Sequence, residues 1–402
     1  MKIACVLPDH LSTLIFCKTL SRLLDLEHNI QLFTISGRAD GLPGVDYIDE
    51  IHRDVISHHI DIPMKRFMSP IKDFFYLIKL YRTLRIGCFT TVITFTTKPN
   101  IIGQFAAFLA GVPFRIMAVR GLGRTFNTPT SIKDKSLQYI MKVLYKFSCH
   151  LSNRVWLTNR GDLNDFLSLR FINKNKSFLT KNAVDLDDFC EERINDVKIE
   201  SLRQELGLNK DNKVVIMVAR LIKEKGVIEF TEAAKRLRGQ LPHLHFLLVA
   251  PEEPFNPSIV HPAYLRKMEA CSNFNWLGFR KDVRELYALS NLAVLPSYYK
   301  EGGYPRALLE AMAYGKPVIA ADTPECRGPV KNGSNGYLVP PKDSKALANA
   351  IKKIIVNPAL SKKMGAHSLL RMKSEFDDKL IFNRLINEVI LRPFKYRQKN
   401  SN

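Results

Sequence analysis

The sequence predicts an α/β protein built from two doubly wound parallel sheets in tandem. Short apolar runs alternate with segments whose apolar residues recur at helical spacing, which is the pattern of strand–helix–strand units. A charged stretch at residues 191–213 interrupts this alternation, which restarts at residue 214. The length of 402 residues also fits two domains better than one.

The first half of the chain supplies the elements of one sheet. An apolar run at residues 3–7 is closed by Pro8, and residues 11–26 carry helical apolar spacing. Further elements of this half are strands expected at 30–35, 92–96, 114–119, 154–157 and 178–181, and a helix at 101–110. Because such apolar strands must be covered by helices on both faces, the order predicts a doubly wound sheet.

The second half repeats the pattern after the charged stretch, which is expected to link the domains and to hold one helix at residues 200–206. Its strands are expected at 214–219, 245–250, 274–277, 292–296 and 317–321, and its helices at 227–237, 262–270, 283–289 and 305–314. Ligands of such sheets bind at the carboxyl ends of the strands, which in tandem sheets face a cleft. Functional residues are therefore expected in the loops that follow the strands.

The composition limits the kinds of ligand and partner that the protein is expected to bind. A formal charge of +21 suits nucleic acid, an anionic membrane or phosphorylated substrates, although a solvated basic surface would explain it equally well. Nucleic-acid binding is disfavoured because the basic residues lie within strand–helix units without interleaved stacking aromatics. Seven scattered cysteines predict reduced thiols in a cytoplasmic protein, and neither a signal peptide nor a membrane-spanning run is expected.

Residues 301–315 are the most informative stretch of the chain. Two carboxylates, Glu301 and Glu310, flank a Gly-Gly pair and a helix that is predicted to start at Pro305. Free amides at a helix start bind phosphate, and glycines let a ligand approach the backbone closely. Carboxylates accept hydrogen bonds from sugar hydroxyls. The segment therefore predicts a site for a nucleotide sugar, which has a diphosphate between two sugars.

A second constellation follows the first strand of the second half. Arg220 is expected at the carboxyl end of that strand, and Lys225 with Gly226 opens the next helix. Two such cations can both reach a diphosphate and stabilise the negative charge that develops on a leaving nucleoside diphosphate. The alternative is a solvated basic loop.

Together these segments resemble the retaining glycosyltransferases of family 4, which have the GT-B fold. The resemblance rests on the Arg-Leu-x-x-x-Lys-Gly turn at 220–226 and on residues 301–320, 333–340, and 181–185 with Ala183 in place of glycine. Residues 97–100 and 120–123 resemble the capsule and O-antigen branch of this family. The resemblance covers nearly the whole chain. It implies an acceptor-binding domain at 1–190, a nucleotide-sugar-binding domain at 191–375, and a segment at 376–402 with a helix that returns to the first domain and a basic tail.

The resemblance also implies residue roles. Arg220 and Lys225 are expected to bind the donor diphosphate, Glu310 the ribose, and Glu301 the donor sugar, although one extra residue separates the two glutamates relative to the family. The other donor-binding residues expected are Gly302, Gly303, Tyr304, Pro305 and Arg306 at the phosphate and sugar, and Gly278, Phe279 and Arg280 beside the base.

On the acceptor side, His10, Lys98 and Arg120 follow strands of the first domain. Lys98 and Arg120 are expected to contact the acceptor phosphate or the donor sugar, and His10 to face the cleft near the acceptor. Two alternatives stay open: His10 could be a loop residue without a functional role, and Lys98 could have a core or surface role. Asp185 and Asp187 mimic a metal-binding Asp-x-Asp motif of another glycosyltransferase architecture. Because two cations already supply positive charge at the diphosphate, neither a metal nor a cofactor is expected.

The function expected from the resemblance is the transfer of one sugar, with retention, from a nucleoside-diphosphate sugar to a polyprenyl-diphosphate-linked saccharide. The expected donor is a UDP-sugar, and the expected pathway is bacterial O-antigen, capsule or exopolysaccharide synthesis. Basic amphipathic segments at 65–85 and 133–146 predict peripheral docking at the inner face of the cytoplasmic membrane, although helices packed on a sheet also have an apolar face. The alternatives are a GDP- or dTDP-sugar donor, a sugar-nucleotide epimerase or phosphorylase, an inactive scaffold subunit and a nucleic-acid-binding protein.

Overall fold

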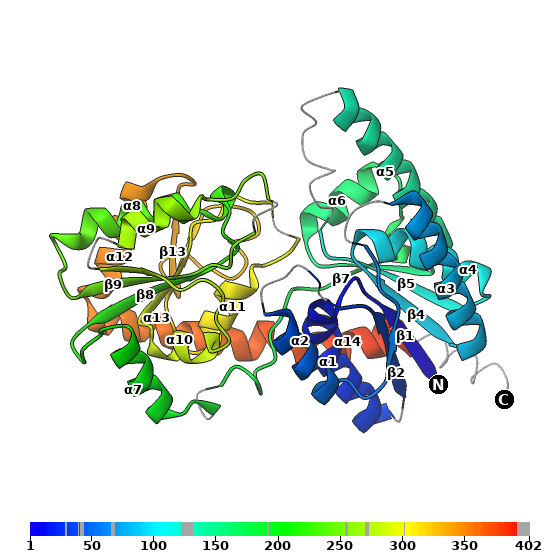
Figure 1. Ribbon diagram of the computed structural model, residues 1–402, viewed down its shortest axis with the longest axis horizontal. Coiled ribbons are helices and arrows are strands. Elements are labelled where there is room, and N and C mark those ends of the chain that lie inside the picture. The colour runs from blue at the N-terminus through cyan, green and yellow to red at the C-terminus, as the bar shows by residue number, and fades with distance from the viewer. Residues whose placement is uncertain are drawn as a thin grey trace. The chain divides into compact units, whose positions relative to one another are not determined.

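The computed structural model describes residues 1–28, 30–38, 40, 44–65, 69–121, 132–190, 193–253, 256–269, 273–300 and 302–391. The chain forms two compact units, the first of Met1–Lys181 with the segment that begins at Lys379, and the second of Asn182–Asp378 (Figure 1). Glu301, the tail at 392–402 and residues 66–68 of the first amphipathic segment lie outside the described residues.

The described part of the first unit contains a parallel sheet of seven strands in the order β3-β2-β1-β4-β5-β6-β7. From β1 the chain moves outward to β3, and from β4 it moves outward in the opposite direction, so β1 and β4 meet at a topological switch point. The strands are β1 (Lys2–Val6), β2 (Gln31–Ser36), β3 (His59–Asp61), β4 (Thr91–Phe95), β5 (Phe114–Val119), β6 (Arg154–Leu157) and β7 (Ser177–Leu179).

Helices cover both faces of this sheet (Figure 1). Alternate side chains of β1 enter different cores, Ile3 packing with α1 and α14, and Ala4 with α3 and α4. The helical elements are α1 (His10–His28), α2 (Val45–Val55), α3 (Pro70–Gly87), a π-helical turn (Pro99–Gly103), α4 (Gln104–Leu109), α5 (Ile132–Leu151), α6 (Arg160–Ser168), a 3-10 turn (Lys174–Lys176), α14 (Asp378–Leu385) and a π-helical turn (Ile386–Ile390).

The described part of the second unit contains a parallel sheet of six strands in the order β10-β9-β8-β11-β12-β13, with the switch point between β8 and β11. The strands are β8 (Lys213–Val218), β9 (Leu244–Val249), β10 (Phe274–Trp276), β11 (Leu292–Leu295), β12 (Val318–Ala321) and β13 (Gly336–Val339). The helical elements are α7 (Asp196–Glu205), a 3-10 turn (Lys223–Lys225), α8 (Val227–Arg238), α9 (Pro262–Glu269), α10 (Val283–Leu289), α11 (Arg306–Ala313), α12 (Ser344–Ile355), α13 (Pro358–Arg371) and a π-helical turn (Met372–Phe376).

Some elements of the structure were not expected from the sequence, and one expected element has a further role. The three-residue strand β3 and the edge strand β13 were not predicted as strands. The charged stretch is not a bare linker, since its helix α7 buries Leu202 in the core of the second unit and contacts α10. In the part of the chain that the structure describes, no helix is long and apolar enough to cross a bilayer.

Candidate active site

The predicted donor residues follow β8 and β11, the two strands that meet at the switch point of the second sheet. Arg220 and Lys225 lie between β8 and α8, and Gly302 to Pro305 lie between β11 and α11. In open α/β sheets the crevice at a switch point is where ligands bind. The topology therefore brings both predicted constellations to one edge of one sheet.

The two cations converge on one aromatic ring. The guanidinium carbon of Arg220 lies 4.9 Å from the centre of the Tyr299 ring, and Nζ of Lys225 lies 5.2 Å from it. Lys225 is 9% exposed, whereas the Arg220 side chain is 39% exposed and meets Glu253 at 4.0 Å, the limit of an ion pair. The π face of Tyr299 offsets part of the repulsion between the cations. The result is a concentrated positive charge, which suits a diphosphate.

The turn that carries Lys225 is fastened to the loop after β11. The Glu224 carbonyl accepts a hydrogen bond from the Tyr298 N–H at 2.9 Å, and the Glu224 carboxylate accepts one from the Ser258 hydroxyl at 2.8 Å. Gly226 has φ +81°, and a Cβ there would lie 2.4 Å from the Pro296 carbonyl oxygen. Glycine is therefore required at this position by both conformation and space.

Helix α11 offers the predicted phosphate-binding amides, with a small correction. Pro305 is the N-cap residue rather than the first helical residue, and its carbonyl accepts the N–H groups of Leu308 and Leu309 at 3.2 and 3.4 Å. The N–H groups of Arg306 and Ala307 precede these first bonds, as at every helix start. Negative charge is favoured at this end of the helix.

Glu310 lies one turn into α11 with its carboxylate held on both sides. One oxygen lies 3.4 Å from Nε of Arg306, and the other lies 3.4 Å from the Tyr287 hydroxyl, which also donates to the nearer Ala307 carbonyl at 3.1 Å. Burial, and then the neighbouring Glu310, raise the pKa of Tyr287 well above its usual range, so the hydroxyl stays a donor. The Glu310 side chain keeps 15% exposure, which leaves acceptor capacity for a ligand hydroxyl.

Asn182 holds the Gly-Gly-Tyr segment in place. Its side-chain amide donates to the Tyr304 carbonyl at 2.8 Å, and Arg306 donates to the carbonyl of Ala183 at 3.1 Å. Gly303 has φ +145°, and a Cβ there would lie 2.6 Å from the amide nitrogen of Asn182. The motif at 181–185 was expected to close the first domain, but from Asn182 onward it belongs to the second unit and supports the donor segment.

The sequence analysis did not anticipate the roles of Asn182, Tyr287 and Tyr299. The motif around Asn182 was visible, yet its partner Tyr304 is 122 residues away and only the tertiary structure joins them. The paired tyrosines at 298 and 299 were the only signal for the ring under the cations.

Gly278, Phe279 and Arg280, the residues predicted beside the base, differ in their contacts. Arg280 is bound by Asp282 at 2.7 and 2.8 Å and by Glu205 at 2.5 Å, and these bonds raise its pKa further above its usual range. Its guanidinium therefore ties the loop after β10 to α7. Gly278 has φ +60°, and Phe279 is 38% exposed, so Phe279 offers the free aromatic face of this group.

The predicted acceptor residues lie at the carboxyl ends of strands in the first unit, and each has a protein partner. His10 is 9% exposed and shares a 2.7 Å hydrogen bond with Asp49. Lys98 pairs with Asp73 at 2.7 Å and donates to a backbone carbonyl at 2.8 Å. The guanidinium carbon of Arg120 lies 4.0 Å from the centre of the Trp156 ring. These contacts all lie within the first unit, and contact of the three residues with an acceptor stays a prediction.

The Asp-x-Asp segment forms a turn. The Asp185 carboxylate accepts a hydrogen bond from the Asp187 N–H at 3.0 Å, and Asp185 is 7% exposed. This is the local side-chain-to-backbone bonding that Asp commonly makes at turns. The Asp-x-Asp segment therefore has a structural role in this turn. That transfer needs no metal stays a prediction.

Comparison with known proteins identifies the family. The family model "Glycosyl transferases group 1" matches residues 198–369. The UDP-Gal:alpha-D-GlcNAc-diphosphoundecaprenol alpha-1,3-galactosyltransferase of Escherichia coli is 30% identical to this chain over 322 residues, which are 79% of each chain. This chain belongs to the group 1 glycosyl transferases.

A second relative agrees with this membership, and solved structures show the same fold. The N,N'-diacetylbacillosaminyl-diphospho-undecaprenol alpha-1,3-N-acetylgalactosaminyltransferase of Campylobacter jejuni is 29% identical over 79% of this chain and 80% of its own length. Anabaena Alr3699/HepE, solved with UDP, matches 97% of this glycosyltransferase and 99% of its own chain with a TM-score of 0.74 at 20% identity. The sucrose-phosphate synthase of Thermosynechococcus elongatus matches all of both chains with a TM-score of 0.72 at 19% identity. The predicted GT-B fold and glycosyltransferase class are confirmed.

Proposed function

We propose that this glycosyltransferase moves one sugar from a UDP-sugar, with retention, to a saccharide on polyprenyl diphosphate. The observation that carries the proposal is the convergence of Arg220 and Lys225 on Tyr299, at the sheet edge where α11 starts. These groups match the parts of a nucleotide sugar: cations and helix amides for the diphosphate, and the Glu310 carboxylate for the ribose.

The chemistry asked of the protein is positioning and stabilisation of the leaving group. Cleavage of the bond between sugar and diphosphate places negative charge on the departing UDP, and Arg220 and Lys225 stabilise that charge. The backbone of Gly302 to Tyr304, fixed by Asn182, borders the sugar. Glu301 is assigned to the sugar hydroxyls, a role that stays a prediction.

Uridine as the base is supported by UDP in the HepE structure and by the UDP-Gal named for the Escherichia coli relative. A thermal-shift screen against UDP-, GDP- and dTDP-sugars tests it. A ligand at about a hundred times its Kd adds about 2.7 kcal/mol to the free energy of unfolding, which is readily visible as a rise in Tm. A larger rise with GDP- or dTDP-sugars than with any UDP-sugar would overturn the assignment of uridine.

The lipid-linked acceptor is supported by the names of two relatives, each of which acts on a sugar joined to undecaprenol through diphosphate. Purified enzyme, a radiolabelled UDP-sugar and a synthetic polyprenyl-diphosphate sugar should give a labelled lipid product. Incubation with the donor alone separates the epimerase alternative, because an epimerase converts its nucleotide sugar without acceptor.

A peripheral membrane site is part of this proposal, supported by an apolar surface on α3 and α5. Helix α3 packs Tyr76, Leu80 and Leu84 into the core, so its inner face is accounted for. Both helices also carry a second apolar set that faces solvent, here called the α3–α5 surface: Ile71, Phe74, Phe75, Ile86, Leu137, Tyr139, Ile140, Val143 and Phe147. Basic residues interrupt this surface on both helices, as expected for docking on anionic lipid.

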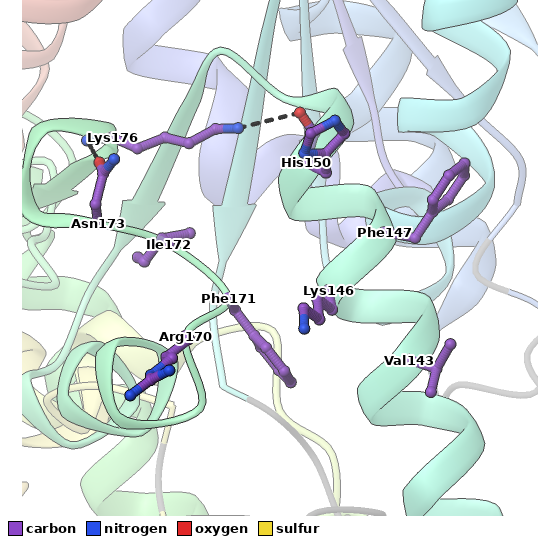
Figure 2. A pocket seen from close by; sticks show the side chains of 9 residues that line it. All are labelled: Val143, Lys146, Phe147, His150, Arg170, Phe171, Ile172, Asn173 and Lys176. Carbon is purple, nitrogen blue, oxygen red and sulfur yellow. Dashed lines mark hydrogen bonds between the residues drawn. The ribbon is translucent and has the colours of Figure 1, made fainter.

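A pocket of about 740 Å³ adjoins the α5 part of this surface. Figure 2 shows that its side chains come from α5 and from residues 170–176, between α6 and β7. Lys146, Arg170 and Lys176 bring positive charge to it, and Val143 and Phe147 belong to the α3–α5 surface. A pocket with cations and apolar side chains suits the phosphate of a lipid headgroup.

Flotation with vesicles tests the membrane proposal. The wild-type protein should float with anionic vesicles at low salt and lose binding at high salt. Phe74→Ser/Phe75→Ser should reduce flotation strongly, whereas Val356→Ser/Leu370→Ser, which removes two exposed apolar side chains from the second unit, should not. Equal flotation of all three proteins, or binding that ignores lipid charge, would exclude docking through this surface.

A further inference from the structure

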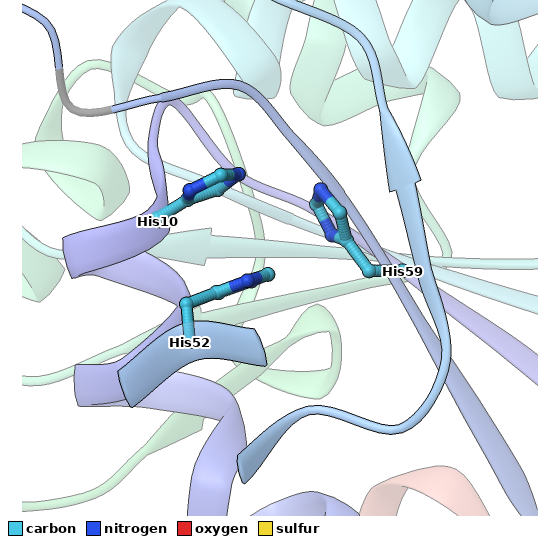
Figure 3. A group of neighbouring side chains, drawn as sticks. All are labelled: His10, His52 and His59. Carbon is cyan, nitrogen blue, oxygen red and sulfur yellow. The ribbon is translucent and has the colours of Figure 1, made fainter. Parts of the chain in front are cut away.

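Three histidines from separate elements of the first unit meet in its interior. His10 is the first residue of α1, His52 lies in the last turn of α2, and His59 begins β3. One ring nitrogen of each lies within 4.8 Å of those of the other two (Figure 3). His10 and His52 are 9% and 2% exposed, and their rings stack with centres 4.0 Å apart.

The outer ring nitrogens of two of these histidines are held by neighbours. Nδ1 of His10 lies 2.7 Å from the Asp49 carboxylate, so Nδ1 carries the proton in this hydrogen bond. Nδ1 of His59 lies 2.9 Å from the Thr34 hydroxyl, which also lies 3.3 Å from a backbone carbonyl; when the hydroxyl donates to that carbonyl, it accepts a proton from Nδ1. In both rings this leaves Nε2 with a lone pair.

The Nε2 atoms of all three histidines are buried and have no hydrogen-bond partner among the described residues. Buried polar atoms without hydrogen-bond partners are rare in proteins, so three of them in one place indicate a site for a ligand. A neutral imidazole binds a metal ion through such a lone pair.

We propose that His10, His52 and His59 bind one transition-metal ion of the Zn²⁺ class through their Nε2 atoms, with Asp49 and Thr34 as the outer partners that orient the rings. Imidazole suits such ions, and metal-bound histidines usually donate their other N–H to a carboxylate or another oxygen. With Zn–N bonds of about 2.1 Å, tetrahedral ligands lie ~3.4 Å apart. The ring nitrogens must therefore draw together from their present separations of up to 4.8 Å, and the stacked rings of His10 and His52 must turn so that both lone pairs point at the ion.

The ion would fasten the start of α1 and the end of α2 to the edge strand β3. Asp49 adds a further link, since its second carboxylate oxygen pairs with Arg38 at 2.7 Å. The donor residues Arg220, Lys225 and Glu310 belong to the other unit, so this inference does not depend on the proposed function.

Titration of Zn²⁺ into tag-free protein that has been stripped of metal tests the proposal. In competition with a chromophoric chelator, the protein should take up one equivalent tightly, and its Tm should rise with Zn²⁺. Co²⁺ should give the visible absorption of a tetrahedral nitrogen site. No uptake by the wild-type protein at a micromolar excess of Zn²⁺ would overturn the proposal.

Variants locate the site. His52→Asn removes a ligand and should weaken Zn²⁺ binding more than about a hundredfold, and Asp49→Asn should weaken it by about tenfold to a hundredfold. His58→Asn is the matched control, because its ring packs on Phe33 at 4.9 Å and should leave the affinity unchanged. If His52→Asn does not fold, the loss in Asp49→Asn together with the Co²⁺ spectrum decides. Wild-type affinity in His52→Asn and Asp49→Asn, or equal losses in His58→Asn, would contradict the proposal.

Discussion

The carboxyl edges of the two sheets differ in what their predicted site residues do. At the second edge, Arg220 and Lys225 turn to the same ring, and Glu310 is oriented by Arg306 and Tyr287. At the first edge, Lys98 pairs with Asp73, and His10 and Arg120 are likewise turned to protein partners. The predicted residues of the second edge thus converge with one another, whereas those of the first edge are each turned to a different protein partner, and ligand contact at both edges stays a prediction.

The difference follows from the kind of group each edge serves. A diphosphate and a ribose are constant, so a short stretch of backbone with fixed glycines and cations can be shaped around them. Gly226 and Gly303 show this, since a Cβ at either position would collide with a neighbouring residue. After the strands of the first sheet, Lys98 and Arg120 instead contact protein side chains.

Loss of either cation should produce the largest effect. Lys225→Ala or Arg220→Ala should lower the rate of transfer by a factor of about a hundred or more, because removal of one preorganised donor to a developing charge has that effect. Transfer of radiolabelled sugar to lipid measures it. Lys223→Ala, which removes an exposed cation from the same turn, should stay near wild type. Near-normal turnover of both Arg220→Ala and Lys225→Ala would refute the donor site.

Gly226→Ala should come next, because it disturbs the turn that places Lys225. Positive φ together with a Cβ 2.4 Å from the Pro296 carbonyl oxygen predicts strain of about 1–3 kcal/mol, with lower Tm and slower transfer. Gly207→Ala is the control, since Gly207 has φ +64° but no atom within 4 Å of the position that a Cβ would take. Equal losses of Tm in the two variants would show that conformation alone matters and that the contact with Pro296 does not.

Glu310→Gln should have an intermediate effect. It keeps the shape of the side chain but removes the charge that accepts the ribose hydroxyls, and hydrogen bonds to charged groups contribute about 1.5–3 kcal/mol. Calorimetry should show UDP affinity reduced by about tenfold or more. Tyr287→Phe should reduce it less, because the Tyr287 hydroxyl lies 3.4 Å from the carboxylate and shares its proton with the nearer Ala307 carbonyl. Normal UDP affinity in the Glu310→Gln variant would show that Glu310 does not bind the ribose.

Sequence alone predicted most of the second edge because its motifs are local. Arg220 and Lys225 share one turn, and Pro305 and Glu310 share one helix, so spacing sufficed to group them. Spacing could not show that Asn182 supports Tyr304, or that Tyr299 lies under both cations, because these pairs form only when strands and loops distant in the chain assemble. The strands of both sheets were largely predictable from their apolar runs, whereas β3 has only three residues and little pattern.

Lys98→Met should have the smallest effect on transfer, and it tests directly whether the two sheet edges differ. The Lys98 and Asp73 side chains are 13% and 15% exposed, so the change leaves a largely buried carboxylate without its cation and should lower the free energy of unfolding by about 1–3 kcal/mol. Chemical denaturation measures this loss, and Lys98→Met/Asp73→Asn should recover part of it because the unpaired charge is gone. The KM for the lipid acceptor should stay within about threefold, since an exposed or packing residue away from the ligand contributes little to binding. A rise of KM above tenfold in a fully stable Lys98→Met variant would instead place Lys98 on the acceptor, and would make the two edges alike.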